Sequence, residues 1–132
     1  MKSIICENYK IFIGENILRN VQLGSYKKIC LLTDKNQKNN IIDYFLKEIK
    51  SEFDIIEIES SEINKNISSV RNIWNFLSQN NYNKNSLIIN LGGGVICDIG
   101  GFCASTFKRG IDFLNIPTTL LSMVDASIGG KN

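Results

Sequence analysis

The chain has 132 residues, of which 43% are hydrophobic and 21% charged, and this length and composition suit a single globular domain without disulfide bonds. Its 15 basic and 13 acidic side chains are spread along the sequence and give a net charge of +2, so no basic block points to nucleic acid. No apolar run approaches the roughly 20 residues of a membrane span, and Glu7, Asn8 and Lys10 interrupt a signal-peptide pattern, so we expect a cytoplasmic protein.

Short apolar runs at the N-terminus predict a β-hairpin formed by residues 3–6 and 10–13, followed by a short helix over residues 15–21. Residues 28–33 form a nearly continuous apolar run, which is typical of a strand covered on both faces. Apolar residues at helical spacing then predict an amphipathic helix over residues 36–51. These residues are Ile41, Ile42, Phe45, Leu46 and Ile49.

The second half of the chain continues the alternation of strand and helix. Further strands are predicted at residues 53–58, 86–91 and 112–116. Further helices are predicted at residues 67–77 and 95–107, with a short one from Thr118, a suitable cap, through Met123. This order predicts an α/β domain over residues 1–132: a Rossmann-like, mostly parallel sheet with helices on both faces and an added N-terminal β-hairpin.

The four cysteines offer no metal-binding pattern. None of Cys6, Cys30, Cys97 and Cys103 forms a CxxC pair, and the chain contains no histidine. We therefore expect no metal site built by this chain alone. We interpret Cys30 as a core residue of a strand, and Cys97 and Cys103 as small apolar residues on one helix.

Three glycines, Gly92 to Gly94, stand between a predicted buried strand and a predicted helix. Such a turn lets a diphosphate approach the backbone, and the free N–H groups of the helix start face the anion. A tight turn without a ligand is the alternative. The position in the strand–helix pattern favours a phosphate or a dinucleotide. The spacing is not GxGxxG, so a standard Rossmann dehydrogenase is not the best match.

Two acidic residues stand where a bound nucleotide would have its sugars. Asp98 lies one turn into the helix after the glycines, where it is a dipole partner or a ribose ligand. Asp34 follows a predicted strand, where it ends the strand or binds the adenosine ribose.

Other polar residues near strand ends also have two interpretations. One hydroxyl of Thr118 and Thr119 caps the next helix and the other can reach a ligand. Lys108 and Arg109 fit a solvated helix end. Lys131, after two glycines, can lie against an anionic substrate.

Taken together, these motifs resemble the N-terminal domain of the 3-dehydroquinate synthase family. The resemblance covers nearly the whole chain and is tightest after residue 86. It is carried by the segments GGGVICD (92–98), GGF (100–102), ASTFKRG (104–110), PTTLL (117–121) and VDASIGGK (124–131), with Thr33-Asp34 and the Glu62-x-x-Lys65 step.

The resemblance implies a two-domain enzyme, with an NAD-binding α/β domain followed by a helical, metal-binding domain that this chain lacks. The implied reaction converts 3-deoxy-D-arabino-heptulosonate 7-phosphate to 3-dehydroquinate and phosphate, in the shikimate pathway, with NAD reduced and re-oxidised within one turnover. The family's zinc or cobalt ion is held by a glutamate and two histidines of the second domain. We therefore expect the chain to be inactive by itself. The resemblance also implies that the complete enzyme is a homodimer.

The resemblance also implies roles for individual residues. Those expected to bind NAD are Asp34, Lys35, Asn36, Glu62, Lys65, Gly93, Gly94, Val95, Asp98, Thr118 and Thr119. Asp125 and Lys131 would meet the sugar phosphate substrate, and Arg109 would reach its phosphate across a dimer interface. Cys97 and Ser61 replace glycines of the family pattern, and Asn132 replaces a threonine.

Two other functions fit the same motifs. The chain could belong to another sugar-phosphate cyclase, of the type that makes an inosose or a valiolone. It could also be a non-catalytic remnant that binds NAD or dimerises.

Overall fold

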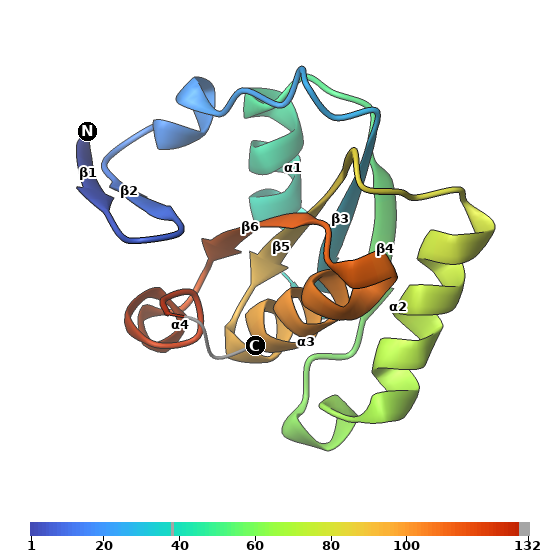
Figure 1. Ribbon diagram of the computed structural model, residues 1–132. Helices are drawn as coiled ribbons and strands as arrows, with labels where there is room; N and C mark the ends of the chain where they lie inside the picture. The colour runs from blue at the N-terminus through green and yellow to red at the C-terminus, as the bar shows by residue number, and fades with distance from the viewer. Residues whose placement is uncertain (38, 130–132) are drawn as a thin grey trace. The chain divides into compact units, whose positions relative to one another are not determined.

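The computed structural model describes residues 1–37 and 39–129, and Figure 1 shows their secondary structure. Their backbone packing divides them into two compact units. The first contains residues 1–24 and 39–51, and the second contains residues 25–37 and 52–129. Each unit has a β-sheet of its own.

The first unit contains an antiparallel hairpin, a 3-10 turn and one helix. Strands β1 (Lys2–Ile5) and β2 (Lys10–Ile13) pair with Ser3 opposite Phe12. The 3-10 turn at Ile17–Asn20 and helix α1 (Asn39–Glu48) are joined by an ion pair of 2.7 Å between Arg19 and Glu48. This pair raises the pKa of Arg19 and lowers that of Glu48, because each charge stabilises the other.

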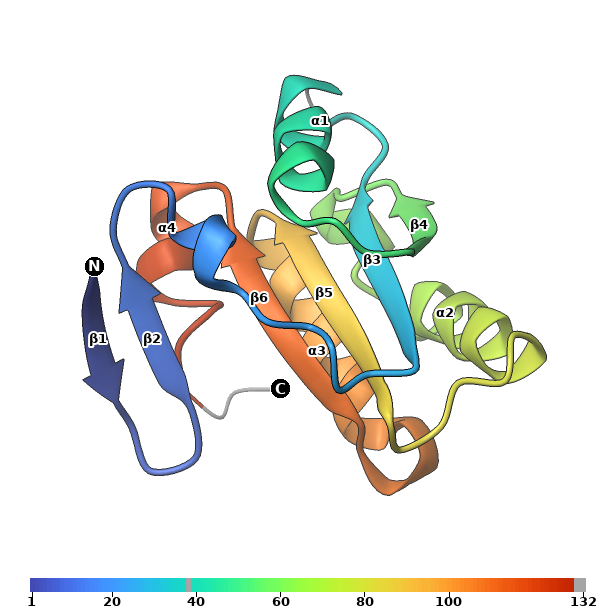
Figure 2. The same ribbon diagram turned by 90° about the horizontal axis from the view of Figure 1, so that it is seen from above.

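The second unit is built on a parallel four-stranded sheet in the order β4-β3-β5-β6 (Figure 2). Its strands are β3 (Lys28–Asp34), β4 (Asp54–Ile58), β5 (Ser86–Gly92) and β6 (Asp112–Pro117). Strand β5 is buried along its whole length, as its apolar sequence predicted. The strand order reverses between β3 and β5, and in open parallel sheets ligands bind at the carboxyl ends of the strands beside such a reversal.

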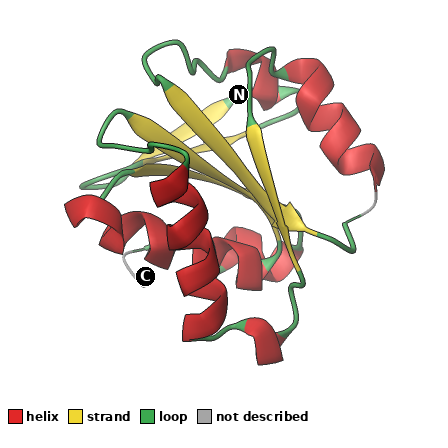
Figure 3. Cartoon of the chain, turned by 90° about the vertical axis from the view of Figure 1, so that its right-hand side faces the viewer, coloured by secondary structure: helices red, strands yellow, loops and turns green. Residues whose placement is uncertain are grey.

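Helices α2 (Ile67–Gln79) and α3 (Gly94–Thr106) cover one face of this sheet (Figures 1 and 3). One core joins both helices to alternate residues of the strands. It includes Leu32, Ile73, Leu77, Ile88 and Ile96, all with at most 1% of their surface exposed. Helix α3 lies on the sheet beside α2 (Figure 1) and begins at Gly94, directly after β5, so its first turn is held at the carboxyl end of that strand.

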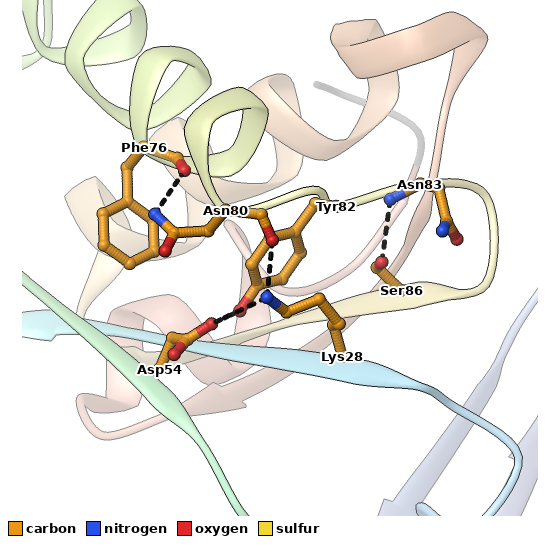
Figure 4. Close-up of polar contacts among 7 residues, drawn as sticks. All are labelled: Lys28, Asp54, Phe76, Asn80, Tyr82, Asn83 and Ser86. Carbon is orange, nitrogen blue, oxygen red and sulfur yellow. Dashed lines mark hydrogen bonds and ion pairs between the residues drawn. The ribbon is translucent and has the colours of Figure 1, made fainter.

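At the opposite, amino edge of the sheet, a buried tyrosine organises a polar cluster (Figure 4). The Tyr82 side chain is fully buried, and its hydroxyl donates to a carboxylate oxygen of Asp54 at 2.6 Å. The Lys28 ammonium lies 5.1 Å from the Tyr82 ring centroid and donates to the carbonyl oxygen of Asn80. Burial, followed by the bond to Asp54, raises the pKa of Tyr82 far above its usual value, so the hydroxyl stays protonated.

The predicted α/β class is confirmed, with its parallel sheet and N-terminal hairpin. The interpretation of Cys30, Cys97 and Cys103 as core residues is also confirmed, because all three are fully buried free thiols. Burial raises the pKa of Cys97 to about 12. The short helix predicted over residues 15–21 is a single 3-10 turn at Ile17–Asn20, which begins only after Asn16, whose φ is 53°.

The predicted boundaries shift by a few residues elsewhere. The helix predicted over residues 36–51 is shorter in the structure, where α1 spans Asn39–Glu48. The helix predicted over residues 95–107 begins at Gly94, and its last turn becomes a separate 3-10 turn, η3, at Phe107–Arg109. Among the residues that the structure describes, no helix is both long and apolar enough to cross a bilayer.

Candidate functional site

The candidate site lies at the carboxyl edge of the four-stranded sheet. Here β3 ends at Asp34, β5 ends at Gly92 and β6 ends at Pro117, and these three strands are neighbours. The N–H of Thr118 donates to the carbonyl oxygen of Gly92 at 2.9 Å, so the segments after β5 and β6 begin side by side. The sheet therefore gathers sequence motifs that lie up to 84 residues apart along the chain (Asp34 to Thr118).

The glycine turn leads directly into α3. Gly93 is the N-cap residue, and the first helical residues are Gly94 and Val95. The first N–H groups of a helix have no partner within it, so those of Gly94 and Val95 are available to an anion.

Gly92 is also needed sterically. A Cβ on Gly92 would stand 2.7 Å from the Ile96 side chain, which packs in the core below. A Cβ on Gly93 would stand 3.4 Å from the Thr119 side chain. The turn therefore keeps its backbone bare on the side that faces the loop after β6.

An ion pair stands one turn beyond the glycines. The ammonium of Lys65 lies 2.6 Å from a carboxylate oxygen of Asp98, and both side chains are part-exposed. This hydrogen bond, with the charges of Asp98, Glu62 and Asp125, raises the pKa of Lys65. Three carboxylates from different segments therefore surround one cation.

An open cavity of about 460 Å³ lies beside this ion pair. It is walled by polar residues from three segments, Lys65, Asp98 and Asp125, with apolar side chains of α2 and α3 beneath them. A concave site with an apolar floor and a few converging charges is the usual form of a small-molecule site. The cavity is also lined by residues to which the sequence analysis gave no role in the site, namely Asn66, Ile67, Val70, Ile99, Phe102 and Ala126.

Asp34 is held in place by two local hydrogen bonds. One carboxylate oxygen accepts from the N–H of Asn36 at 2.8 Å, and the other accepts from the hydroxyl of Ser60. The N–H of Lys35 donates to the carbonyl oxygen of Ile58, at the end of β4. These contacts fix the Asp34 carboxylate at the reversal of strand order. Ser60 carried no motif that could have revealed this contact in the sequence.

The roles of the two threonines after β6 differ from the prediction, in which Thr118 caps the next helix. Thr119 is the N-cap of α4 (Leu120–Val124), and its hydroxyl accepts from the N–H of Ser122 at 3.2 Å. In return, the Ser122 hydroxyl accepts from the N–H of Thr119 at 3.3 Å, which completes a capping box. Thr118 is half-buried beside Gly92 instead. One extra residue before the helix therefore moves the cap from Thr118 to Thr119.

Arg109 does not join the other predicted site residues. It lies in η3, after α3 has crossed the sheet from the carboxyl end of β5 to the amino end of β6. A helix of 13 residues spans about 20 Å, so Arg109 and Asp125 of one chain stand at opposite edges. Lys131 lies outside the described residues.

The described residues do not fit a metal ion. The chain has no histidine, and within residues 1–37 and 39–129 no three side chains of cysteine, aspartate or glutamate gather closely enough to hold one.

Residues 55–132 match the family model of the 3-dehydroquinate synthase N-terminal domain. The chain belongs to this family. A 3-dehydroquinate synthase of Pelagibacter ubique is 44% identical over 132 residues, which cover 95% of the present chain and 36% of the relative. The chain thus spans about a third of the length of the curated relatives it matches.

Two solved structures share the fold. A 2-deoxy-scyllo-inosose synthase, crystallised with carbaglucose-6-phosphate, NAD+ and Co2+, gives a TM-score of 0.83 at 22% identity over 95% of this chain and 37% of its own. A 2-epi-5-epi-valiolone synthase of Streptomyces hygroscopicus, with NAD+ and Zn2+ bound, gives 0.79 at 24% identity over 98% and 38%. Both similarities establish the fold of this family member and not its substrate.

Proposed function

We propose that this chain is the NAD-binding part of a cytoplasmic 3-dehydroquinate synthase. The complete enzyme would convert 3-deoxy-D-arabino-heptulosonate 7-phosphate to 3-dehydroquinate and phosphate, as a phosphate-eliminating lyase of the shikimate pathway. The observation that carries this proposal is the cavity in which Lys65, Asp98 and Asp125 meet beside the glycine turn. Relatives with the same function name match almost the whole chain.

The residues at the carboxyl edge fit NAD. The bare glycine turn and the N–H groups of Gly94 and Val95 suit its diphosphate. Asp98 can accept a hydrogen bond from the neighbouring ribose, and Asp34 one from the adenosine ribose, with Lys35 and Asn36 beside it. NAD, when bound, would accept a hydride from the carbon that bears a substrate hydroxyl, whose O–H proton leaves separately, and would later return the hydride.

Glu62 and Lys65 would line the same NAD pocket, and Thr118 and Thr119 would face the nicotinamide half. Lys65 would then link the two ligand sites. It pairs with Asp98, which would face the cofactor, and the charge of Asp125, which would face the substrate, also acts on it. Its ammonium orients the Asp98 carboxylate through their ion pair, and a carboxylate accepts hydroxyl hydrogen bonds.

Asp125 and Lys131 would meet the sugar phosphate, and Arg109 of a second copy would bind its phosphate. The position of Arg109 at the far edge of the sheet supports this arrangement, since one chain cannot bring it to its own Asp125. An arginine fork matches a phosphate with two parallel hydrogen bonds. The proposed enzyme is therefore a homodimer. No step is assigned to a metal ion, because residues 1–37 and 39–129 offer no set of ligands for one.

Calorimetric titration of NAD into the purified protein, with Asp98→Asn as a matched variant, tests the cofactor site. We expect measurable binding that Asp98→Asn weakens about tenfold, or about 1.4 kcal/mol. Equal binding by both proteins, or no binding, would contradict the assignment.

Phosphate release from 3-deoxy-D-arabino-heptulosonate 7-phosphate, in the presence of NAD and Zn2+ or Co2+, tests the reaction. The complete enzyme should release phosphate, and the 132-residue chain by itself should not, because it has no histidine for the expected metal site. The same fold occurs in 2-deoxy-scyllo-inosose synthase, so a cyclase with another substrate is the second candidate. Tighter binding of carbaglucose-6-phosphate than of the heptulosonate phosphate would favour that candidate.

A further inference from the structure

Three consecutive residues at the end of η3 have left-handed backbone conformations. The φ angles of Lys108, Arg109 and Gly110 are 47°, 68° and 97°. Glycine adopts this region freely, whereas a side chain with a Cβ is disfavoured there. The other described non-glycine residues with positive φ are Asn16 and Asn81, and asparagine tolerates this region. A lysine followed by an arginine therefore needs something that holds it in this turn.

The lysine has such an anchor. Its ammonium donates to the carbonyl oxygen of Tyr82 at 2.8 Å and lies 5.4 Å from the ring centroid of Phe107. The carbonyl is itself fixed, because the Tyr82 side chain is fully buried and bonded to Asp54 (Figure 4). Lys108 thus ties the turn to the polar cluster at the amino edge of the sheet.

The neighbouring arginine is left available. Arg109 is exposed, and among residues 1–37 and 39–129 no hydrogen bond or ion pair holds its guanidinium. Within the turn, the N–H of Gly110 donates to Phe107 at 2.8 Å and the N–H of Ile111 to Ala104 at 2.9 Å. The backbone on both sides of Arg109 is therefore fixed while its side chain faces solvent. Strained backbone of this kind persists where the surroundings over-determine it, and it concentrates at functional sites.

From these contacts we infer that Lys108 is a positioning residue for Arg109. Its hydrogen bond to the Tyr82 carbonyl holds the left-handed turn, and the turn directs the Arg109 guanidinium toward the phosphate of a sugar phosphate bound by a second copy. This inference rests on the proposed function for the phosphate and on the observed contacts for the turn.

Hydrogen exchange measured on the protein tests the anchor without any activity. In Lys108→Met, which keeps the apolar stem, the amides of Gly110 and Ile111 should exchange about tenfold faster. Lys108→Arg, which can still donate to the carbonyl, should retain most of the protection. The amide of Asp125, bonded to Leu121 at the other edge, serves as the control and should not change. Unchanged exchange in Lys108→Met, or an equal rise at Asp125, would overturn the inference.

A double-mutant cycle tests whether Lys108 acts through Arg109. The readout is the affinity for 3-deoxy-D-arabino-heptulosonate 7-phosphate in the presence of NAD. Lys108→Met and Arg109→Ala should each weaken it, and the double variant should bind no more weakly than Arg109→Ala, because the lysine has no effect without the arginine. Additive losses would overturn the inference. If Arg109→Ala binds the heptulosonate phosphate normally, the phosphate role of Arg109 fails and the inference fails with it. If the unsubstituted protein does not bind this compound, the proposed function fails, and the hydrogen-exchange result still decides whether Lys108 anchors the turn.

Discussion

At the amino edge of the sheet Asp54 accepts a hydrogen bond from the buried hydroxyl of Tyr82, whereas at the carboxyl edge Asp98 pairs with Lys65 beside an open cavity. The tyrosine of the first pair is fully buried, and both partners of the second are part-exposed. A hydrogen bond to a buried group stabilises the fold, because losing it leaves that group without a partner. An exposed ion pair adds little stability and leaves its charges free to meet a ligand.

The same contrast separates the glycine turn from the loop that carries Tyr82. Gly92 to Gly94 have no side chains, so no Cβ covers the backbone of this turn. In the loop between α2 and β5, the Tyr82 side chain is completely buried in the core. Substitutions at the amino edge should therefore reduce stability, and substitutions at the carboxyl edge should reduce binding.

The largest effect is expected for Tyr82→Ala. Removing this ring leaves a cavity beneath α2 and should lower the free energy of unfolding by about 3–5 kcal/mol. Urea unfolding followed by circular dichroism measures the loss. Tyr44→Ala, at a tyrosine with 42% of its surface exposed, is the control and should cost less than about 1 kcal/mol. A similar loss in both variants would break the comparison.

Gly93→Val should act on binding instead. The added side chain covers the backbone where the diphosphate would approach, so NAD affinity should fall at least about tenfold, or about 1.4 kcal/mol. Among the described residues, Thr119 is the nearest to the new Cβ, at an ordinary contact distance of 3.4 Å, so the unfolding free energy should change little. Gly24→Val is the control, because no described residue stands within 4 Å of an added Cβ there. A large loss of stability with unchanged NAD affinity would reverse the roles given to the two edges.

Tyr82→Phe sharpens the comparison because it keeps the ring. It removes the hydroxyl that donates to Asp54 and should cost about 1 kcal/mol of stability, well below the loss in Tyr82→Ala. The heat of NAD binding should be the same as in the unsubstituted protein. A variant as stable as the original would mean that the hydrogen bond contributes nothing to the amino edge.

The smallest change in stability is expected for Asp98→Asn. The ion pair is part-exposed, so its loss should cost less than about 1 kcal/mol at neutral pH. Because the folded pKa of Lys65 is raised, this small contribution is fully present below the unfolded pKa of about 10.4 and disappears as the pH rises through the folded value. Unfolding free energies of both proteins between pH 7 and 11.5 measure it. A difference that grows toward high pH would contradict the pairing.

The turn between β5 and α3 was predicted correctly because its pattern is local. Gly92 to Gly94 directly follow the apolar run of β5 and lead into the helix. The cap before α4 was misplaced by one residue, because Thr118 and Thr119 are equally good caps in sequence. Only the hydrogen bond of Thr118 to Gly92 in the neighbouring segment leaves Thr119 as the cap.

The sequence by itself determined the order of strands and helices, the burial of β5 and the family, because periodicity and motif spacing are local properties of the chain. The tertiary structure decided which motifs share a site. The parallel sheet brings Lys65, Asp98 and Asp125 to one cavity and sends Arg109 to the opposite edge. It also decided that Lys108 bonds to Tyr82, 26 residues earlier. Contacts between distant segments depend on how the strands pair and the helices pack, and no local pattern records them.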